Sequence, residues 1–180
     1  INRPGSRATI PACRPALLKT MNKNAVYLLL LKKLEVDLDV LQRAAQTAYE
    51  AATDKENIAE NKYDTLGLEA SYLATGQARR VEEIRQALKN CQAMTQAPYA
   101  TAQGIQVGDL IRLEAVNGNE QWVLLAPDAA GLKLIQDDQT ITVITPRAPL
   151  GAALLRKQPD DDVQINVGGT VQTFTVCDTY

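Results

Sequence analysis

Residues 27–52 read YLLLLKKLEVDLDVLQRAAQTAYEAA, and this stretch decides the fold of the first half of the chain. Apolar side chains recur along it at spacings that alternate between four and three residues. The series is Tyr27, Leu31, Leu34, Leu38, Leu41, Ala45, Ala48 and Ala52. This alternation places one apolar stripe along a helix and is typical of the a and d positions of a coiled coil. We therefore predict a long helix over residues 22–52.

A second helix is predicted over residues 58–94, with apolar residues that can pack against the first stripe. They are Tyr63, Leu66, Ala70, Leu73, Ile84, Leu88 and Cys91. The rhythm slips around residues 77–81, as a four-residue insertion into a heptad pattern would make it do. Gly67 and Gly76 lie within this helix, and we interpret them as points of close contact. Because the connection between the helices is short, the sequence predicts an antiparallel coiled-coil hairpin over residues 22–95.

The pattern changes after a linker at residues 96–104, which contains Pro98 and Gly104. Alternating apolar and polar residues then predict a series of strands joined by turns, of which Asn117-Gly118-Asn119 is the strongest. The expected strands cover residues 105–116, 120–126, 132–136, 140–145, 162–167 and 170–176, with a short helix at 149–157. The fold class is therefore α+β, with a helical hairpin followed by a small antiparallel β domain at residues 105–178.

Composition excludes several classes of function. The chain contains no histidine and only three cysteines, which are far apart. A structural zinc site and the usual Ser-His or Cys-His catalysis are therefore not expected, nor is a disulfide framework. Aromatic residues make up only 4% of 180 residues, which indicates that part of the chain is elongated. The net charge of −2 argues neither for nor against nucleic-acid binding.

Residues 1–20 are basic and rich in proline, and they show no helical or strand period before Leu17. Three interpretations compete: an extension upstream of a natural start at Met21, an expression remnant, or a disordered basic arm. We favour the first. The apolar run at residues 25–31 is too short to span a bilayer. We therefore expect a soluble, cytoplasmic protein without a membrane partner, and the intramolecular hairpin favours a monomer.

Acidic residues gather where the two helices meet, at Asp54, Glu56 and Glu60. Glu56 and Glu60 are four residues apart, so on a helix they would share one face. Carboxylates are ligands suited to Mg²⁺, and a pair on an exposed tip could complete a metal site that belongs to a partner. In the alternative interpretation, Thr53 and Glu56 form a capping box, and the other acids favour the positive end of the helix. The residues alone leave both interpretations open.

A basic stretch follows on the second helix, comprising Arg79, Arg80, Arg85 and Lys89. We interpret it as a solvated helix face that balances Glu82 and Glu83. Direct contact with nucleic acid is the alternative.

Two motifs and the order of the elements resemble the Gre-type bacterial transcription elongation factors. The sequence AENKY at residues 59–63 is similar to the family's Ser-Glu-Asn-x-x-Tyr tip, with the tyrosine shifted. The sequences APLGAALL at 148–155 and DDDV at 160–163 resemble the Ser-Pro-x-x-x-Ala-Leu helix and Gly-Asp-x-Val turn of the family's C-terminal domain. The resemblance covers about residues 22–177.

The resemblance implies an FKBP-like C-terminal domain that docks at the rim of the RNA polymerase secondary channel, with Arg147, Pro149 and Leu150 at the contact. It also implies that the hairpin enters the channel. Glu60 and Glu56, with Asp54, would then help to hold a catalytic Mg²⁺ of the polymerase, which cleaves its own backtracked RNA at the 3′ end. The factor would have no cofactor of its own and would not itself be an enzyme.

Two departures from the family pattern affect these expectations. The family carries an acid three residues before the motif glutamate, where this chain has the neutral Asn57. The family's Asp-Ser before the C-domain proline is replaced by Arg147-Ala148. Polymerase binding therefore carries over better than transcript cleavage. A regulator that binds the channel without stimulating cleavage is the alternative to a cleavage factor.

Two functions from other classes compete with these. A prolyl isomerase would need an apolar pocket lined by aromatic residues, and the C-terminal domain and its linker offer only Tyr99, Trp122, Phe174 and Tyr180. A simple coiled-coil scaffold would explain the heptads. It would not explain an acidic tip together with the motifs of the C-terminal domain.

Overall fold

The computed structural model describes residues 21–53 and 66–180. The predictions for residues 1–20 and for Asp54, Glu56 and Glu60 therefore lie outside the described residues. The described chain forms two compact units. A helical unit contains residues 24–94 together with 127–129, and a sheet unit contains residues 95–126 and 130–180 together with 21–23.

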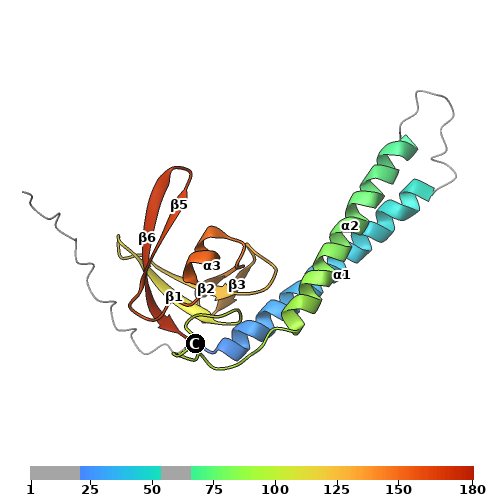
Figure 1. Cartoon of the computed structure of the whole chain (residues 1–180). Helices are drawn as coiled ribbons and strands as arrows, with labels where there is room; N and C mark the ends of the chain where they lie inside the picture. Colours follow the sequence, from blue (N-terminus) through green and yellow to red (C-terminus); the bar gives the residue numbers. More distant parts are fainter. Residues whose placement is uncertain (1–20, 54–65) are drawn as a thin grey trace, which may run out of the picture. The chain divides into compact units, whose positions relative to one another are not determined.

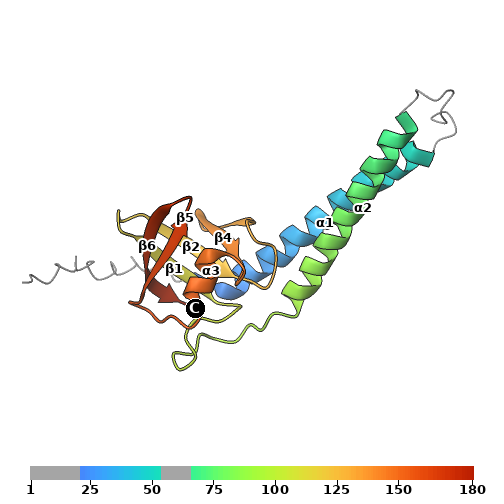
Figure 2. The ribbon, with the colours of Figure 1, turned by 45° about the horizontal axis from the view of Figure 1, so that its top comes forward.

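The helical unit is built from α1 (Lys23–Thr53) and α2 (Leu66–Gln92), which lie side by side in both views (Figure 1 and Figure 2). The first helix begins and ends within one residue of its predicted bounds. Its apolar stripe is confirmed, because Leu34 and Ala48 are buried and the other six members are half-buried. Leu28 and Val36, which lie off the stripe, are exposed, but Val26 and Leu30, which also lie off it, have no exposed surface. The predicted a/d rhythm therefore identifies one packed face of α1 and misses two of its buried residues.

The stripe of α2 differs from its prediction. Its members alternate at four and three residues without a break: Ala70, Ala74, Gln77, Val81, Ile84, Leu88 and Cys91, each half-buried or buried. Leu73, which was placed in the stripe, is 56% exposed, so that placement is wrong. The predicted four-residue insertion is wrong as well. The small Ala74 and the polar Gln77 belong to the packed stripe, although hydrophobicity alone did not place them there.

Gly76 is not a point of close contact with the described residues, contrary to the prediction. A methyl group built on it would have none of their atoms within 4 Å outside its own helix backbone and chain neighbours. We expect Gly76→Ala to stabilise the helical unit by about 1 kcal/mol, because alanine loses less backbone entropy than glycine in a helix interior. Urea unfolding followed by circular dichroism at the helix band checks this. A destabilised variant would mean that the space around Gly76 is filled.

The sheet unit contains six strands in the order β3-β4-β2-β1-β6-β5 and one short helix. The strands are β1 (Leu110–Ala115), β2 (Glu120–Leu125), β3 (Lys133–Gln136), β4 (Gln139–Ile144), β5 (Asp162–Val167) and β6 (Thr170–Thr179), and the helix is α3 (Pro149–Leu154). The predicted strands are confirmed, although β1 begins five residues later than expected. One neighbouring pair, β2 and β4, is parallel, so the sheet is mixed rather than wholly antiparallel.

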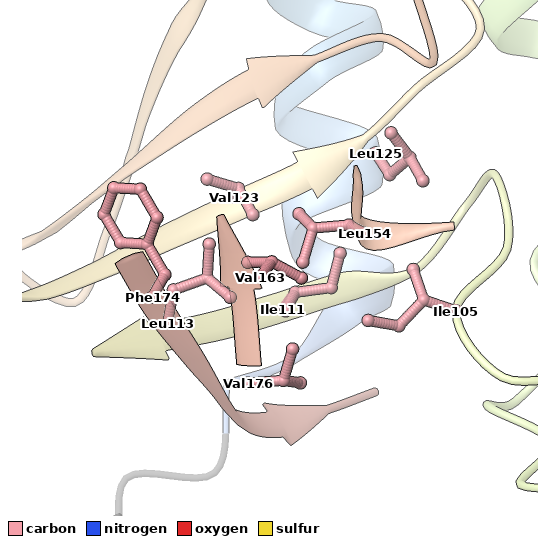
Figure 3. Close-up of a cluster of buried hydrophobic side chains, with 9 residues drawn as sticks. All are labelled: Ile105, Ile111, Leu113, Val123, Leu125, Leu154, Val163, Phe174 and Val176. Carbon is pink, nitrogen blue, oxygen red and sulfur yellow. The ribbon is translucent and has the colours of Figure 1, made fainter. Parts of the chain in front are cut away.

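One face of this sheet carries the apolar core, to which α3 contributes Leu154 (Figure 3). The cluster consists of Ile105, Ile111, Leu113, Val123, Leu125, Leu154, Val163, Phe174 and Val176. Alternate residues of β1 and β2 project to the other face, where Arg112 and Trp122 are also buried. The Arg112 guanidinium donates to Asp178 at 2.6 Å and to Glu120 at 2.9 Å. These two carboxylates balance its buried charge.

The cysteines differ partly from expectation. Cys177 is disulfide-bonded, although the sequence did not indicate a disulfide framework. Cys91 is a free thiol with no exposed surface, and burial raises its pKa to about 11. Such a thiol stays protonated and unreactive at neutral pH. Among the described helices, none is both long and apolar enough to cross a membrane.

Candidate functional site

The end of α1 brings the chain to the predicted acidic tip. The Thr53 hydroxyl donates to the carbonyl oxygen of Tyr49 at 2.9 Å and lies 3.3 Å from that of Glu50. It thus bonds to the last turn of its own helix. A capping box would instead require Thr53 to precede the first turn of a following helix. The described part of this segment therefore favours a role for Thr53 in ending α1.

The described part of the tip half of the hairpin contains acidic residues and no basic ones. Residues 44–53 and 66–78 contain Glu50 and Glu69 and no lysine or arginine. The side-chain amide of Gln46 donates to Glu50 at 2.7 Å. The described approach to the tip is therefore acidic on both helices.

Farther from the tip, two of the basic side chains of α2 form ion pairs with acids of the same helix. The Arg79 guanidinium lies 3.1 Å from Glu83, and Arg85 pairs with Glu82 one turn away. All four side chains are at least half exposed, so these pairs contribute little to stability. The interpretation of this stretch as a solvated, charge-balanced helix face is supported by these pairs.

The motif at residues 148–155 forms the corner between β4 and α3. Proline occupies the first turn of α3, where its fixed φ suits the helix and its missing amide hydrogen is not needed. Arg147 and Pro149 are exposed, whereas Leu150 is half-buried and packs against the apolar core. Two of the three predicted contact residues therefore reach the surface at one corner, and the third mainly supports it.

Gly151 fixes this corner against the sheet. A methyl group built on Gly151 would lie 2.8 Å from the carbonyl carbon of Thr145, closer still to its oxygen, and 3.2 Å from Leu125. The same carbonyl oxygen accepts a hydrogen bond from the amide of Ala148 at 2.9 Å. The helix can approach the end of β4 this closely only because residue 151 has no side chain.

The motif at residues 160–163 forms the turn into β5. Asp160 has a φ of 70°, a left-handed conformation that glycine adopts more readily than other residues. The Gly-Asp-x-Val motif that this sequence resembles has glycine at that position. The Asp161 carboxylate accepts the amide hydrogen of Gln158 at 2.8 Å, and the Thr175 hydroxyl donates to Asp162 at 2.8 Å. The sequence identified this motif, and the positive φ of Asp160 and these two hydrogen bonds define the shape of the turn.

The aromatic residues do not form a common pocket among the described residues. The rings of Trp122 and Tyr180 lie 5.9 Å apart between centroids. Phe174 belongs to the apolar core on the other face of the sheet, against which Tyr99 also packs. This distribution does not favour a prolyl isomerase site.

The described residues contain no group of three or more histidine, cysteine, aspartate or glutamate side chains that could hold a metal ion. The acids proposed to approach Mg²⁺ lie outside the described residues.

Comparison with known proteins found no matching family model and no matching curated protein. Solved structures that match include Gfh1 of Thermus aquaticus, at 22% identity over 87% of this chain and 95% of that chain, with a TM-score of 0.35. The GreA factor homolog Gfh1 of Thermus thermophilus matches at 17% identity over 83% and 94% of the two chains, with a TM-score of 0.34.

A third match is the transcription elongation factor GreA/GreB of Nitrosomonas europaea, at 17% identity over 43% of this chain and 60% of that chain, with a TM-score of 0.31. The sequence identity and the TM-score are low for all three structures.

Proposed function

We propose that this chain is a transcription elongation factor that binds bacterial RNA polymerase through its secondary channel. The conjunction of three features supports the proposal: a long hairpin, an acidic approach to its tip, and a sheet unit whose α3 corner and β5 turn carry the two motifs. A scaffold would need only the first of them.

The hairpin has the length for such a role. The 31 residues of α1 span about 45 Å at 1.5 Å per residue. A two-helix rod of this length can reach deep into a channel while its base stays at the rim. The exposed Arg147 and Pro149 would contact the rim, and Leu150 would hold their corner in place.

At the tip, Glu60 and Glu56 would supply carboxylate oxygens to a Mg²⁺ ion of the polymerase, with Asp54 nearby. The metal would stabilise the attacking and leaving oxygens during hydrolysis of the backtracked RNA. This chain would act as an accessory factor on the polymerase active site and would need no cofactor of its own.

RNA cleavage in backtracked elongation complexes tests the proposal. Purified bacterial RNA polymerase with labelled RNA and Mg²⁺ is incubated with and without this protein. We expect shortened RNA with the natural chain and at least about a tenfold slower reaction with Glu60→Ala, because one transition-state ligand is lost. Glu50→Ala, which removes an exposed acid from the described shaft, is the matched control and should cleave normally.

Asn57 favours the alternative, a channel-binding regulator that does not stimulate cleavage. If binding occurs without shortened RNA, Asn57→Asp decides between the two, because it restores the acid three residues before Glu60. Cleavage gained by Asn57→Asp would identify a regulator that has lost a ligand. Failure of the natural chain to bind the polymerase would refute both forms of the proposal.

A further inference from the structure

All the charged side chains of four neighbouring strands lie on one face of the sheet. The strands β1, β2, β5 and β6 contain five charged residues in all, which we call the charged face: Arg112, Glu114, Glu120, Asp162 and Asp178. In β1, Arg112 and Glu114 alternate with residues of the apolar core, so they belong to the opposite face. The strand register places the acids of β2, β5 and β6 on that face as well.

The charged face is acidic. Four carboxylates against one guanidinium leave a formal charge of −3. The guanidinium of Arg112 contacts two of these carboxylates, those of Glu120 and Asp178. Glu114 lies directly opposite Glu120 in the antiparallel pair β1–β2, and like charges in such a position destabilise a sheet. A segment with basic side chains would therefore complement this face.

A bonded cysteine lies beside the charged face. The pairing of β6 with β1 shifts register at Cys177, which is an extra residue in a β-bulge. Its sulfur lies 3.9 Å from the carboxylate of Glu114. Cys177 is disulfide-bonded, Cys91 is a free thiol, and the sequence contains three cysteines. Within one chain, Cys13 is therefore the cysteine that remains to pair with Cys177.

Residues 1–20 have the charge and the length to reach this face. They contain four basic residues and no acid. Lys23, at the start of α1, lies 3.0 Å from Asp109, the residue before β1. Cys177 lies beside β1 between three and four residues farther along, which is roughly 12 Å at 3.3 Å per residue. Cys13 and Lys23 are ten residues apart, and an extended chain of that length spans about 33 Å.

We propose that the charged face is the docking surface for residues 1–20 of this same chain, held there by a disulfide bond between Cys13 and Cys177. The bond would bring Arg14, the next residue, beside the carboxylates of the face. A second copy of the chain would instead bring two acidic faces together. The proposal supports the interpretation of residues 1–20 as a basic arm of the protein. It is independent of the proposed function, because it involves no polymerase.

Mass spectrometry of the full chain tests the covalent part of the proposal. The protein is first equilibrated with glutathione disulfide, which takes two electrons and two protons from a pair of thiols and leaves as two molecules of glutathione. Free thiols are then alkylated in denaturant, and trypsin places each cysteine in a separate peptide. We expect peptide 8–19 joined to peptide 158–180, with Cys91 alkylated. An alkylated Cys13, or two joined copies of 158–180, would refute the bond.

The equilibrium between this disulfide and glutathione tests the electrostatic part. Its position gives the effective concentration of Cys13 at Cys177, which docking of the arm raises. Glu114→Gln removes a carboxylate next to Cys177, and we expect the effective concentration to fall about threefold. Asp138→Asn is the matched control. It makes the same change of charge at an exposed residue between β3 and β4, at the other end of the strand order, and should leave the value unchanged.

Urea unfolding followed through Trp122 fluorescence checks that the sheet unit stays folded in both variants. If Glu114→Gln lowers the effective concentration no more than Asp138→Asn does, the charged face is not the docking surface, even where the disulfide forms. Neither result bears on polymerase binding, so the proposed function stands or falls separately.

Discussion

Leu34→Asp is expected to unfold the helical unit. Leu34 lies in the apolar stripe of α1 and is only 2% exposed. The substitution removes a packed apolar side chain and places a carboxylate without a partner in its position, and each change destabilises by several kcal/mol. Circular dichroism should show loss of most of the helical signal. The near-ultraviolet signal of Trp122 should persist, because its ring belongs to the sheet unit.

Leu28→Asp is the matched control for this prediction. It introduces the same change in the same helix, six residues earlier, at a side chain that is 63% exposed. A substitution there should alter the free energy of unfolding by no more than about 0.5 kcal/mol. Equal loss of helix in both variants would contradict the assignment of the packed stripe.

Gly151→Ala is expected to destabilise the sheet unit by at least about 2 kcal/mol, because overpacking against a backbone atom forces the chain to move. The added methyl group would overlap the Thr145 carbonyl, which cannot swing aside as a flexible side chain can. Denaturant unfolding followed through Trp122 fluorescence measures the loss. The corner that carries Arg147 should shift with α3, and under the proposed function this would also weaken binding to the polymerase.

Ala152→Ser tests the specificity of that effect. Ala152 is the next residue of α3 and its side chain is exposed, so the substitution should leave the stability of the sheet unit nearly unchanged. If Gly151→Ala were tolerated as well as this control, the close approach of α3 to the end of β4 would be wrong.

The helical hairpin was predictable because large apolar residues mark a packed face of α1 in the sequence. Leucines at positions 31, 34, 38 and 41 keep a strict register. Val26 and Leu30 lie outside this register and are buried as well, so it does not account for every buried position. In α2 the packed positions are filled by Ala74 and Gln77, while the more hydrophobic Leu73 faces outward. A prediction from hydrophobicity fails where small or polar residues pack and large apolar ones are exposed. This explains why a four-residue insertion was wrongly predicted in α2.

The sheet was predictable strand by strand but not in its pairing. Local alternation identifies a strand, whereas the choice of neighbour depends on contacts across the whole unit. The parallel pair β2–β4 arises because β3 lies at the edge and β4 returns beside β2. Of the candidate site residues, Arg147, Pro149 and Leu150 could be located, and Asp54, Glu56 and Glu60 lie outside the described residues. The positive φ of Asp160 could be predicted only from the resembled motif, which has glycine at that position.

The pairing of β1 with β6 sets an order of events during synthesis. Ile111 pairs with Thr179, so β1 lacks one of its two neighbours until the ribosome has delivered nearly the last residue of this sequence. Both helices of the hairpin are complete by Gln92. At about 5–20 residues per second, translation of the remaining strands takes several seconds. During that interval the helical hairpin can fold, while one edge of β1 has no partner strand and is open to unwanted strand pairing. The nascent chain is therefore most vulnerable to aggregation just before β6 emerges.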